Sequence, residues 1–198
     1  MKIAALGNPR SRQEELGQFL TATPVADFMA SMFGPLPRAT RSTPRYLWGL
    51  LVKAIIEVFC ARWSPGAAIL GICDIKRNVL HLNSQALAAL GVTLDSAAKL
   101  PDVIIHHKAK NRLLLIKAVV KVGPVDEKRR KELKDMFAGS KPHLVFVTAF
   151  ETRRTMQTFV SHIAWESEVW IAEDPDHMIH FNGERFLGPY PDVMPIKP

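Results

Sequence analysis

The residues best suited to chemistry lie in one segment, residues 99–125, where an aspartate precedes a lysine-rich stretch. Asp102 opens a β-branched strand, a polar turn follows, and residues 113–122 predict a second strand that pairs back on the first. An aspartate on such a hairpin can hold Mg²⁺ beside a scissile phosphodiester when the opposite strand supplies another carboxylate. The second strand here contains no acid and carries Lys117 and Lys121. The pattern therefore indicates metal-dependent phosphodiester chemistry from which one acid is absent.

The composition indicates a globular chain that could bind a polyanion. With 198 residues and 47% hydrophobic content, the chain fits one domain with a buried core, or one domain plus a short extension. A formal net charge of +7 makes DNA a reasonable partner, although a mildly basic balance also fits proteins that bind none. Cys60 and Cys73 form no CxxC pair, and we expect both thiols to be buried and reduced.

The N-terminal residues and the apolar runs favour a cytoplasmic protein. The first fifteen residues lack the long apolar core of a signal peptide. No apolar run approaches the length that would cross a bilayer. We therefore predict cytoplasmic localisation and no membrane partner.

A change in composition near residue 45 predicts two regions. Residues 1–45 form a short head with two faint helices, and residues 46–198 form the main domain. Arg38, Arg41 and Arg45 lie at the junction, together with three hydroxyl side chains. This junction suits an exposed linker that contacts DNA phosphates, or a solvated loop without that role.

The main domain is predicted to be an α/β fold in which helices flank a mixed β-sheet. Residues 46–63 are nearly apolar all round, which is typical of a helix buried on most sides. A second hairpin is expected at residues 67–83. A helix of mixed charge begins at Asp126, and its basic residues, Arg129 included, are expected on a solvated face. The remaining predicted elements are a helix from Ser84 to Gly91, a strand at 144–149, a helix from Thr152 and a final strand at 168–172.

The run from Lys53 to Pro189 resembles the catalytic domain of type II restriction endonucleases of the BsuBI/PstI kind. The matching segments are KAIIEVFCARWSPG from Lys53, ALAALGV from Ala86, KLPDV from Lys99, GPVDEKRRKEL from Gly123, VFVTAF from Val145, IAWESEVWIA from Ile163 and PDHMIHFNGERFLGP from Pro175. They cover over two thirds of the chain in consistent order. The last segment is the most specific, because long ordered strings of Trp, His, Asn and Gly rarely recur by chance. The resemblance implies a restriction-endonuclease-like, PD-(D/E)XK fold.

The head departs from the family pattern. Family members usually carry a larger N-terminal region that resembles a winged helix, and TPVADFMASMFG from Thr23 looks like a piece of it. We expect residues 1–45 to be a remnant of that DNA-binding region, so that sequence-specific reading of DNA lacks its usual element.

The resemblance implies Mg²⁺-dependent hydrolysis of double-stranded DNA, with a carboxylate pair binding the ion and water attacking phosphorus. Asp102 matches the first acid of the family motif. Lys117 stands where the family has a Glu, and Ala118-Val119 match the residues that follow it. Unit charges about 4 Å apart interact by about 4 kcal/mol at an effective dielectric near 20, so a lysine at this position opposes binding of a divalent ion.

Two arrangements of the site are open. In the first, Mg²⁺ is bound by Asp102 and Asp74, and the phosphate is polarised by Lys99 or Lys121. Asp74 matches an acidic position of the family. In the second, Asp102 forms an ion pair with Lys117 that holds the hairpin without metal.

Three hypotheses for function follow from the resemblance. The first is a hydrolase of a restriction-modification system, a type II site-specific endodeoxyribonuclease that is weak or inactive. The second is a pseudoenzyme that binds DNA, through Arg38, Arg41, Arg45 and Lys117, or binds an intact relative. The third is a decaying gene product with no selected activity. A homodimer is expected by analogy, because nucleases that cut palindromes act in pairs.

Overall fold

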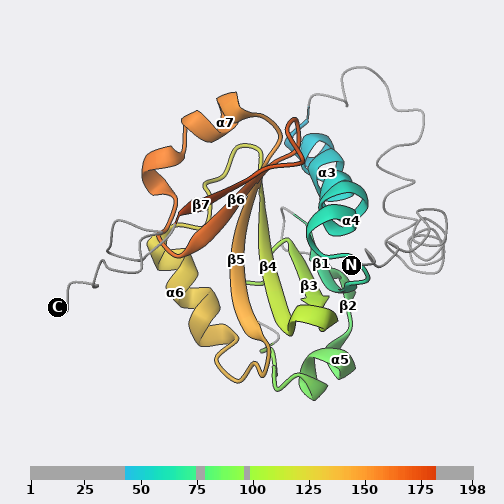
Figure 1. Ribbon diagram of the computed structural model, residues 1–198. Helices are drawn as coiled ribbons and strands as arrows, with labels where there is room; N and C mark the ends of the chain where they lie inside the picture. Colours follow the sequence, from blue (N-terminus) through green and yellow to red (C-terminus); the bar gives the residue numbers. More distant parts are fainter. Residues whose placement is uncertain (1–42, 75–78, 96–98, 182–198) are drawn as a thin grey trace, which may run out of the picture.

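The computed structural model describes residues 43–74, 79–95 and 99–181 and contains one seven-stranded mixed sheet (Figure 1). The strands are β1 (Ala68–Cys73), β2 (Val79–Leu82), β3 (Val103–His107), β4 (Arg112–Val119), β5 (His143–Phe150), β6 (Ser167–Ile171) and β7 (Met178–Phe181). Their order across the sheet is β2-β1-β3-β4-β5-β6-β7. β5 runs parallel to β4 and β6, and the other neighbouring strands are antiparallel. The predicted mixed sheet is confirmed.

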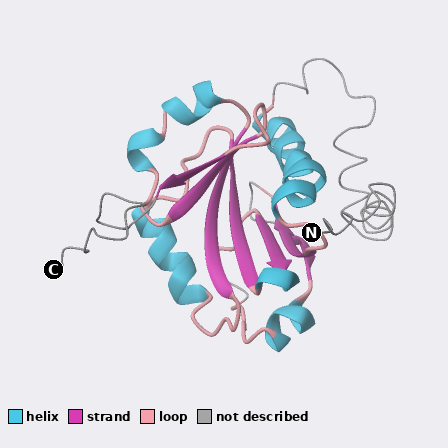
Figure 2. Ribbon diagram, in the orientation of Figure 1, coloured by secondary structure: helices cyan, strands magenta, loops and turns pink. Residues whose placement is uncertain are grey.

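Helices cover both faces of this sheet (Figure 2). They are α3 (Pro44–Ala54), η2 (Ile55–Phe59), α4 (Cys60–Trp63), α5 (Ser84–Ala89), η3 (Lys108–Lys110), α6 (Glu127–Met136), α7 (Arg153–Gln157) and η4 (Val160–His162). On one face, α3, η2 and α4 bury Trp48, Ile55 and Phe59 against the sheet. On the other face, α5 and α6 contribute Leu87 and Leu133 to a second core. The site described below lies on this second face.

The long apolar helix predicted at residues 46–63 is present, and it begins two residues earlier. Thr43 caps it by accepting a hydrogen bond from the Tyr46 backbone N–H at 3.3 Å, and Pro44 occupies the first turn. The π-helical turn η2 interrupts the α-helical hydrogen-bond pattern between α3 and α4. Arg45 therefore belongs to helix α3 rather than to the predicted linker.

Strand β1 is irregular where it approaches the site. Its pairing with β3 shifts register between Ile69 and Gly71, and its pairing with β2 shifts between Ile72 and Cys73. Because of the first shift, Ile69 and Ile72 both pack into the α3 core although they are three residues apart. The Cys73 backbone N–H then donates to the Asp102 carbonyl oxygen at 2.9 Å, which joins the end of β1 to the start of β3.

One predicted strand end was wrong, and the sequence missed one strand. β4 ends at Val119, because Val119 pairs with Phe150, the last residue of its parallel partner β5. Lys121 therefore lies in the loop beyond the strand instead of on it. In addition, the strand predicted at 168–172 is not the last one, because Met178–Phe181 pairs with β6 as an edge strand.

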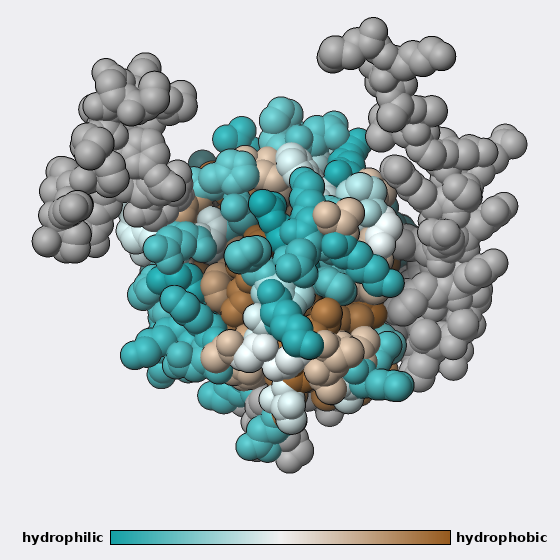
Figure 3. Space-filling view, turned by 60° about the horizontal axis from the view of Figure 1, so that its bottom comes forward, coloured by the Kyte–Doolittle hydropathy of each residue, from teal (hydrophilic) through white to brown (hydrophobic). Residues whose placement is uncertain are grey.

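Polar side chains surround smaller apolar patches on the face of the molecule seen in Figure 3. Within the described residues, no helix is both long and apolar enough to cross a membrane.

Cys60 and Cys73 are buried free thiols, as predicted. Burial raises the pKa of each thiol to about 12.

A close backbone approach fixes the end of α5 to the loop between α6 and β5. Gly91 has a φ of +86°, and a Cβ atom at Gly91 would overlap the carbonyl oxygen of Gly139. The backbone N–H of Lys141 donates to the Leu90 carbonyl oxygen at 2.9 Å across the same contact. Only residues without a side chain allow these two segments to meet so closely.

We therefore expect Gly91→Ala to lower the free energy of unfolding by about 2–4 kcal/mol, from backbone strain and the clash with Gly139. Gly123→Ala is the matched control, because no atom lies within 4 Å of a Cβ atom built there. Urea denaturation followed by circular dichroism measures both variants. Equal stability of the two variants would contradict the tight contact at Gly91.

Candidate functional site

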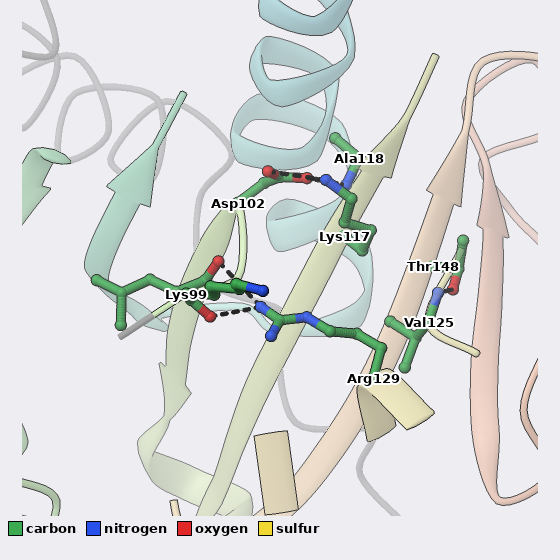
Figure 4. Close-up of polar contacts among 8 residues, drawn as sticks. Lys99, Asp102, Lys117, Ala118, Val125, Arg129 and Thr148 are labelled. Atoms are coloured by element: carbon green, nitrogen blue, oxygen red, sulfur yellow. Dashed lines mark hydrogen bonds and ion pairs between the residues drawn. The ribbon is translucent and has the colours of Figure 1, made fainter. Parts of the chain in front are cut away.

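Asp102 lies immediately before β3 and is nearly buried, with 6% of its side chain exposed. Three hydrogen bonds converge on its carboxylate (Figure 4). Lys117 Nζ donates to Oδ1 at 3.2 Å and to Oδ2 at 2.9 Å, and the Ala118 backbone N–H donates to Oδ2 at 2.7 Å. The ion pair predicted between Asp102 and Lys117 is therefore present.

The strand register makes this pair. β3 and β4 are antiparallel with Val103 opposite Ile116. Asp102, just before β3, therefore lies opposite Lys117 of β4. Because side chains alternate along a strand, both project from the face on which Leu115 packs with α5 and α6. Neither side chain needs a loop to bring it to the other.

Burial raises the pKa of the Asp102 carboxyl group above its usual range. The positive charge and hydrogen bonds of Lys117 oppose this shift, as do the Ala118 backbone N–H and the Trp48 side chain. Lys117 is thus the main group that compensates the buried negative charge. Its own side chain is 23% exposed and reaches solvent from the partner strand.

Asp74 lies at the end of β1, and its side chain is fully buried. Arg45 from α3 approaches it, with 3.5 Å between Arg45 Nη2 and Asp74 Oδ2. Burial raises the pKa of Cys73, and the negative charges of Asp102 and Asp74 add to the shift. Both carboxylates therefore act on the Cys73 thiol, which places them in one region.

An open cleft of about 930 Å³ contains the predicted chemical residues. Asp74, Asp102, Lys99, Lys117 and Lys121 all line it. The structure thus brings together residues from the end of β1, the segment before β3, β4 and the following loop. Their catalytic and metal-binding roles stay predictions.

The predicted DNA-contacting arginines are placed differently. Arg38 and Arg41 lie outside the described residues. Arg45 lies on α3 beside Asp74, so its guanidinium group neutralises a buried carboxylate at the edge of the cleft.

Arg129 of α6 is a structural residue of the site that the sequence did not reveal. Its Nη2 donates to the carbonyl oxygens of Lys99 at 2.5 Å and Leu100 at 3.2 Å, which ties α6 to the segment leading into Asp102 (Figure 4). Its Nη1 donates to Glu132 at 3.1 Å, and its side chain is only 19% exposed. The prediction of a solvated face was wrong here, because the partners are backbone carbonyls 29 and 30 residues away in sequence.

The loop after β4 is also anchored. The Val125 backbone N–H donates to Thr148 Oγ1 at 3.1 Å, and the Val125 carbonyl oxygen accepts from the Ala164 backbone N–H at 3.0 Å. Asp126 then caps α6 by accepting from the Arg129 backbone N–H at 2.7 Å. These contacts hold the end of this loop that leads into α6, and Lys121 lies in the same loop.

The oxygen atoms in the cleft do not fit the Mg²⁺ site that the family motif implies. Mg²⁺ requires near-octahedral oxygen ligands, usually including carboxylates. Both Asp102 oxygens accept hydrogen bonds from Lys117, and Asp74 faces Arg45. In the part of the chain that the structure describes, no group of three or more His, Cys, Asp or Glu side chains gathers as a metal site. As arranged in this structure, the two carboxylates therefore do not form a Mg²⁺ site.

Comparison with known proteins gives consistent matches. The family model described as the BsuBI/PstI restriction endonuclease domain matches residues 48–184. The chain is 47% identical over 140 residues to type II restriction enzyme BsuBI of Bacillus subtilis, covering 71% of this chain and 44% of that enzyme. It is 29% identical over 145 residues to type II restriction enzyme AplI of Arthrospira platensis (strain NIES-39 / UTEX 3086 / IAM M-135), covering 70% and 45%.

A solved structure gives the same fold. The structure of SdaI restriction endonuclease matches with a TM-score of 0.66 and 40% sequence identity, over 73% of this chain and 46% of that one. The seven-stranded sheet with flanking helices is thus restriction-endonuclease-like, as predicted. The chain spans less than half the length of each of these relatives.

Replacing Lys117 tests the energetics of the ion pair. We expect Lys117→Met to lower the free energy of unfolding by about 2–3 kcal/mol near neutral pH, because the Asp102 carboxylate stays buried without its partner. The double variant Asp102→Asn, Lys117→Met is the control, and it should recover most of the loss. Urea denaturation of both variants and the parent gives these free energies.

The loss caused by Lys117→Met should also depend on pH. Removing the ammonium group raises the pKa of Asp102 further above its unfolded value of about 3.9. Between these two pKa values the folded state binds a proton that the unfolded state lacks, so stability falls as pH rises through the interval. The loss relative to the parent should be smallest at acid pH and largest near neutrality. A loss independent of pH would contradict the role of Lys117 in neutralising Asp102.

Proposed function

The chain belongs to the BsuBI/PstI restriction endonuclease family, and we propose that it binds double-stranded DNA in the Asp102 cleft while its Mg²⁺-dependent cleavage is impaired. The observation that supports impaired cleavage is the ion pair between Lys117 and Asp102. Membership of the family supports DNA as the ligand. We therefore treat the domain as a weak or inactive nuclease that retains the substrate cleft.

The side chain at position 117 sets the charge next to the Asp102 carboxylate. A carboxylate there would attract a divalent ion, whereas the Lys117 ammonium group repels it. Two unit charges about 4 Å apart interact by about 4 kcal/mol at an effective dielectric near 20. The repulsion between the Lys117 ammonium group and a divalent ion at that distance is therefore at most about 8 kcal/mol. Lys117 also holds both Asp102 oxygens. The first metal ligand of the family motif is thus already engaged.

Basic side chains in the cleft support DNA binding through phosphates. Lys99 and Lys121 are exposed and line the cleft, and Lys117 reaches it from β4. Contacts of this kind contribute affinity that is independent of sequence and weakens with salt. We propose that these three lysines contact the DNA backbone, with Arg38, Arg41 and Arg45 as further proposed contacts.

A second candidate function is slow cleavage of DNA with an unconventional ligand set. Asp74 and Asp102 line the same cleft, and the Lys117 side chain is partly exposed, so a swing of Lys117 toward solvent would free the Asp102 carboxylate, whereas Asp74 would stay beside Arg45. In that arrangement Asp102 and Asp74 would hold Mg²⁺, and Lys99 or Lys121 would stabilise charge on the phosphate. Cleavage of both strands would require two copies, so a homodimer belongs to this proposal.

Lys117→Glu tests the proposed function directly. We expect the parent to show neither heat of Mg²⁺ binding in calorimetry nor nicking of supercoiled plasmid with Mg²⁺. Lys117→Glu restores the family acid opposite Asp102 and should bind Mg²⁺ measurably. Lys121→Glu makes the same charge change in the same cleft away from Asp102, and it should not.

The parent itself decides between the two candidate functions. Nicking of plasmid by the parent that disappears in Asp74→Asn would support slow cleavage and would overturn the proposed impairment. Absence of salt-sensitive DNA binding by the parent would overturn the DNA-binding proposal, and would leave a gene product with no selected activity.

A further inference from the structure

We propose that the Lys117 ammonium group takes the electrostatic place of a metal ion, so that the cleft binds DNA phosphate without divalent cations. The inference rests on the proposed DNA-binding function and adds how the same site is controlled. A nuclease site with two acids depends on its metal ion for positive charge. Here the charge is part of the polypeptide.

The charge balance of the cleft supports this substitution. Among the described residues that line the cleft, five are basic and five are acidic. The basic residues are Lys99, Lys117, Lys121, Lys128 and Arg129, and the acidic residues are Asp74, Asp95, Asp102, Asp126 and Glu132. A Glu at position 117 would make the lining negative by two charges, which repels DNA. One Mg²⁺ ion carries the charge that would cancel this excess, and the change from Glu to Lys has the same effect.

The geometry leaves Lys117 able to contact a phosphate while it stays paired. An ammonium group has three N–H donors. Lys117 directs donors to Oδ1 and Oδ2 of Asp102 at 3.2 Å and 2.9 Å. Lys117 lines the cleft and its side chain is 23% exposed, so the paired ammonium group can be reached from the cleft. A phosphate oxygen can therefore bind without separating the ion pair.

The position of the charge is fixed by the sheet. Lys117 lies on β4, which is hydrogen-bonded to β3 on one side and β5 on the other. The Ala118 backbone N–H holds the same carboxylate that Lys117 binds. A cation positioned in this way needs little reorganisation when DNA arrives, and it does not depend on the concentration of a divalent ion.

Fluorescence anisotropy with a labelled short DNA duplex tests the inference. The parent is measured in EDTA and in Mg²⁺ at constant ionic strength, because Mg²⁺ itself screens phosphates. We expect the two dissociation constants to agree within about twofold. Circular dichroism and thermal unfolding of each variant confirm that it is folded.

Three variants sharpen the test. Lys117→Glu should bind about tenfold more weakly than the parent in EDTA and regain affinity when Mg²⁺ is added, because it restores the acid pair. Asp102→Asn removes an acid and keeps Lys117, so it should bind DNA more tightly than the parent in EDTA. Lys121→Met is the matched control, and it should weaken binding by the same factor in EDTA and in Mg²⁺.

The outcomes separate this inference from the proposed function. Binding by the parent that requires Mg²⁺ overturns the inference and leaves DNA binding in place. Absence of DNA binding by the folded parent under both conditions overturns both. If Lys117→Glu does not fold, Asp102→Asn decides: tighter binding in EDTA supports the inference, and loss of binding overturns it.

Discussion

The ion pair between Lys117 and Asp102 is the interaction on which the site depends. It places two opposite charges on adjacent strands of the central sheet, with the carboxylate nearly buried and the ammonium group at the edge of the cleft. Each group limits what the other can do, because Asp102 cannot offer free oxygens while Lys117 occupies them, and Lys117 cannot leave without stranding a buried charge. The pair therefore has a structural role as well as an electrostatic one.

Several contacts hold the pair in place, and most of them involve the backbone. The register of β3 and β4 sets the two residues opposite each other, and Arg129 fixes the segment before β3 through its carbonyl groups. The irregular end of β1 brings Asp74 to the same cleft. The shape of the cleft therefore rests on strand register and backbone contacts as well as on the charged side chains that line it.

The fold of this domain and the chemistry of its cleft can be considered separately. The mixed sheet and the flanking helices are those of a restriction-endonuclease-like domain. DNA binding depends mainly on charge at the cleft, whereas hydrolysis with Mg²⁺ depends on a set of oxygen ligands. The Lys117 ammonium group bears on these two requirements in opposite directions, because a positive charge repels a divalent cation and attracts a phosphate.

The sequence by itself determined the family, the α/β class, and most strands and helices, because these follow from ordered motifs and from the alternation of residues along strands. It left open whether Asp102 pairs with Lys117 or joins Asp74 at a metal ion, and the structure shows the ion pair with Lys117. It could not determine that β4 stops at Val119, since that depends on where its partner β5 ends. Nor could it reveal that Arg129 turns inward or that Arg45 faces Asp74, because those partners are distant in sequence. Contacts between residues far apart in the chain were decided only by tertiary packing, which no local pattern encodes.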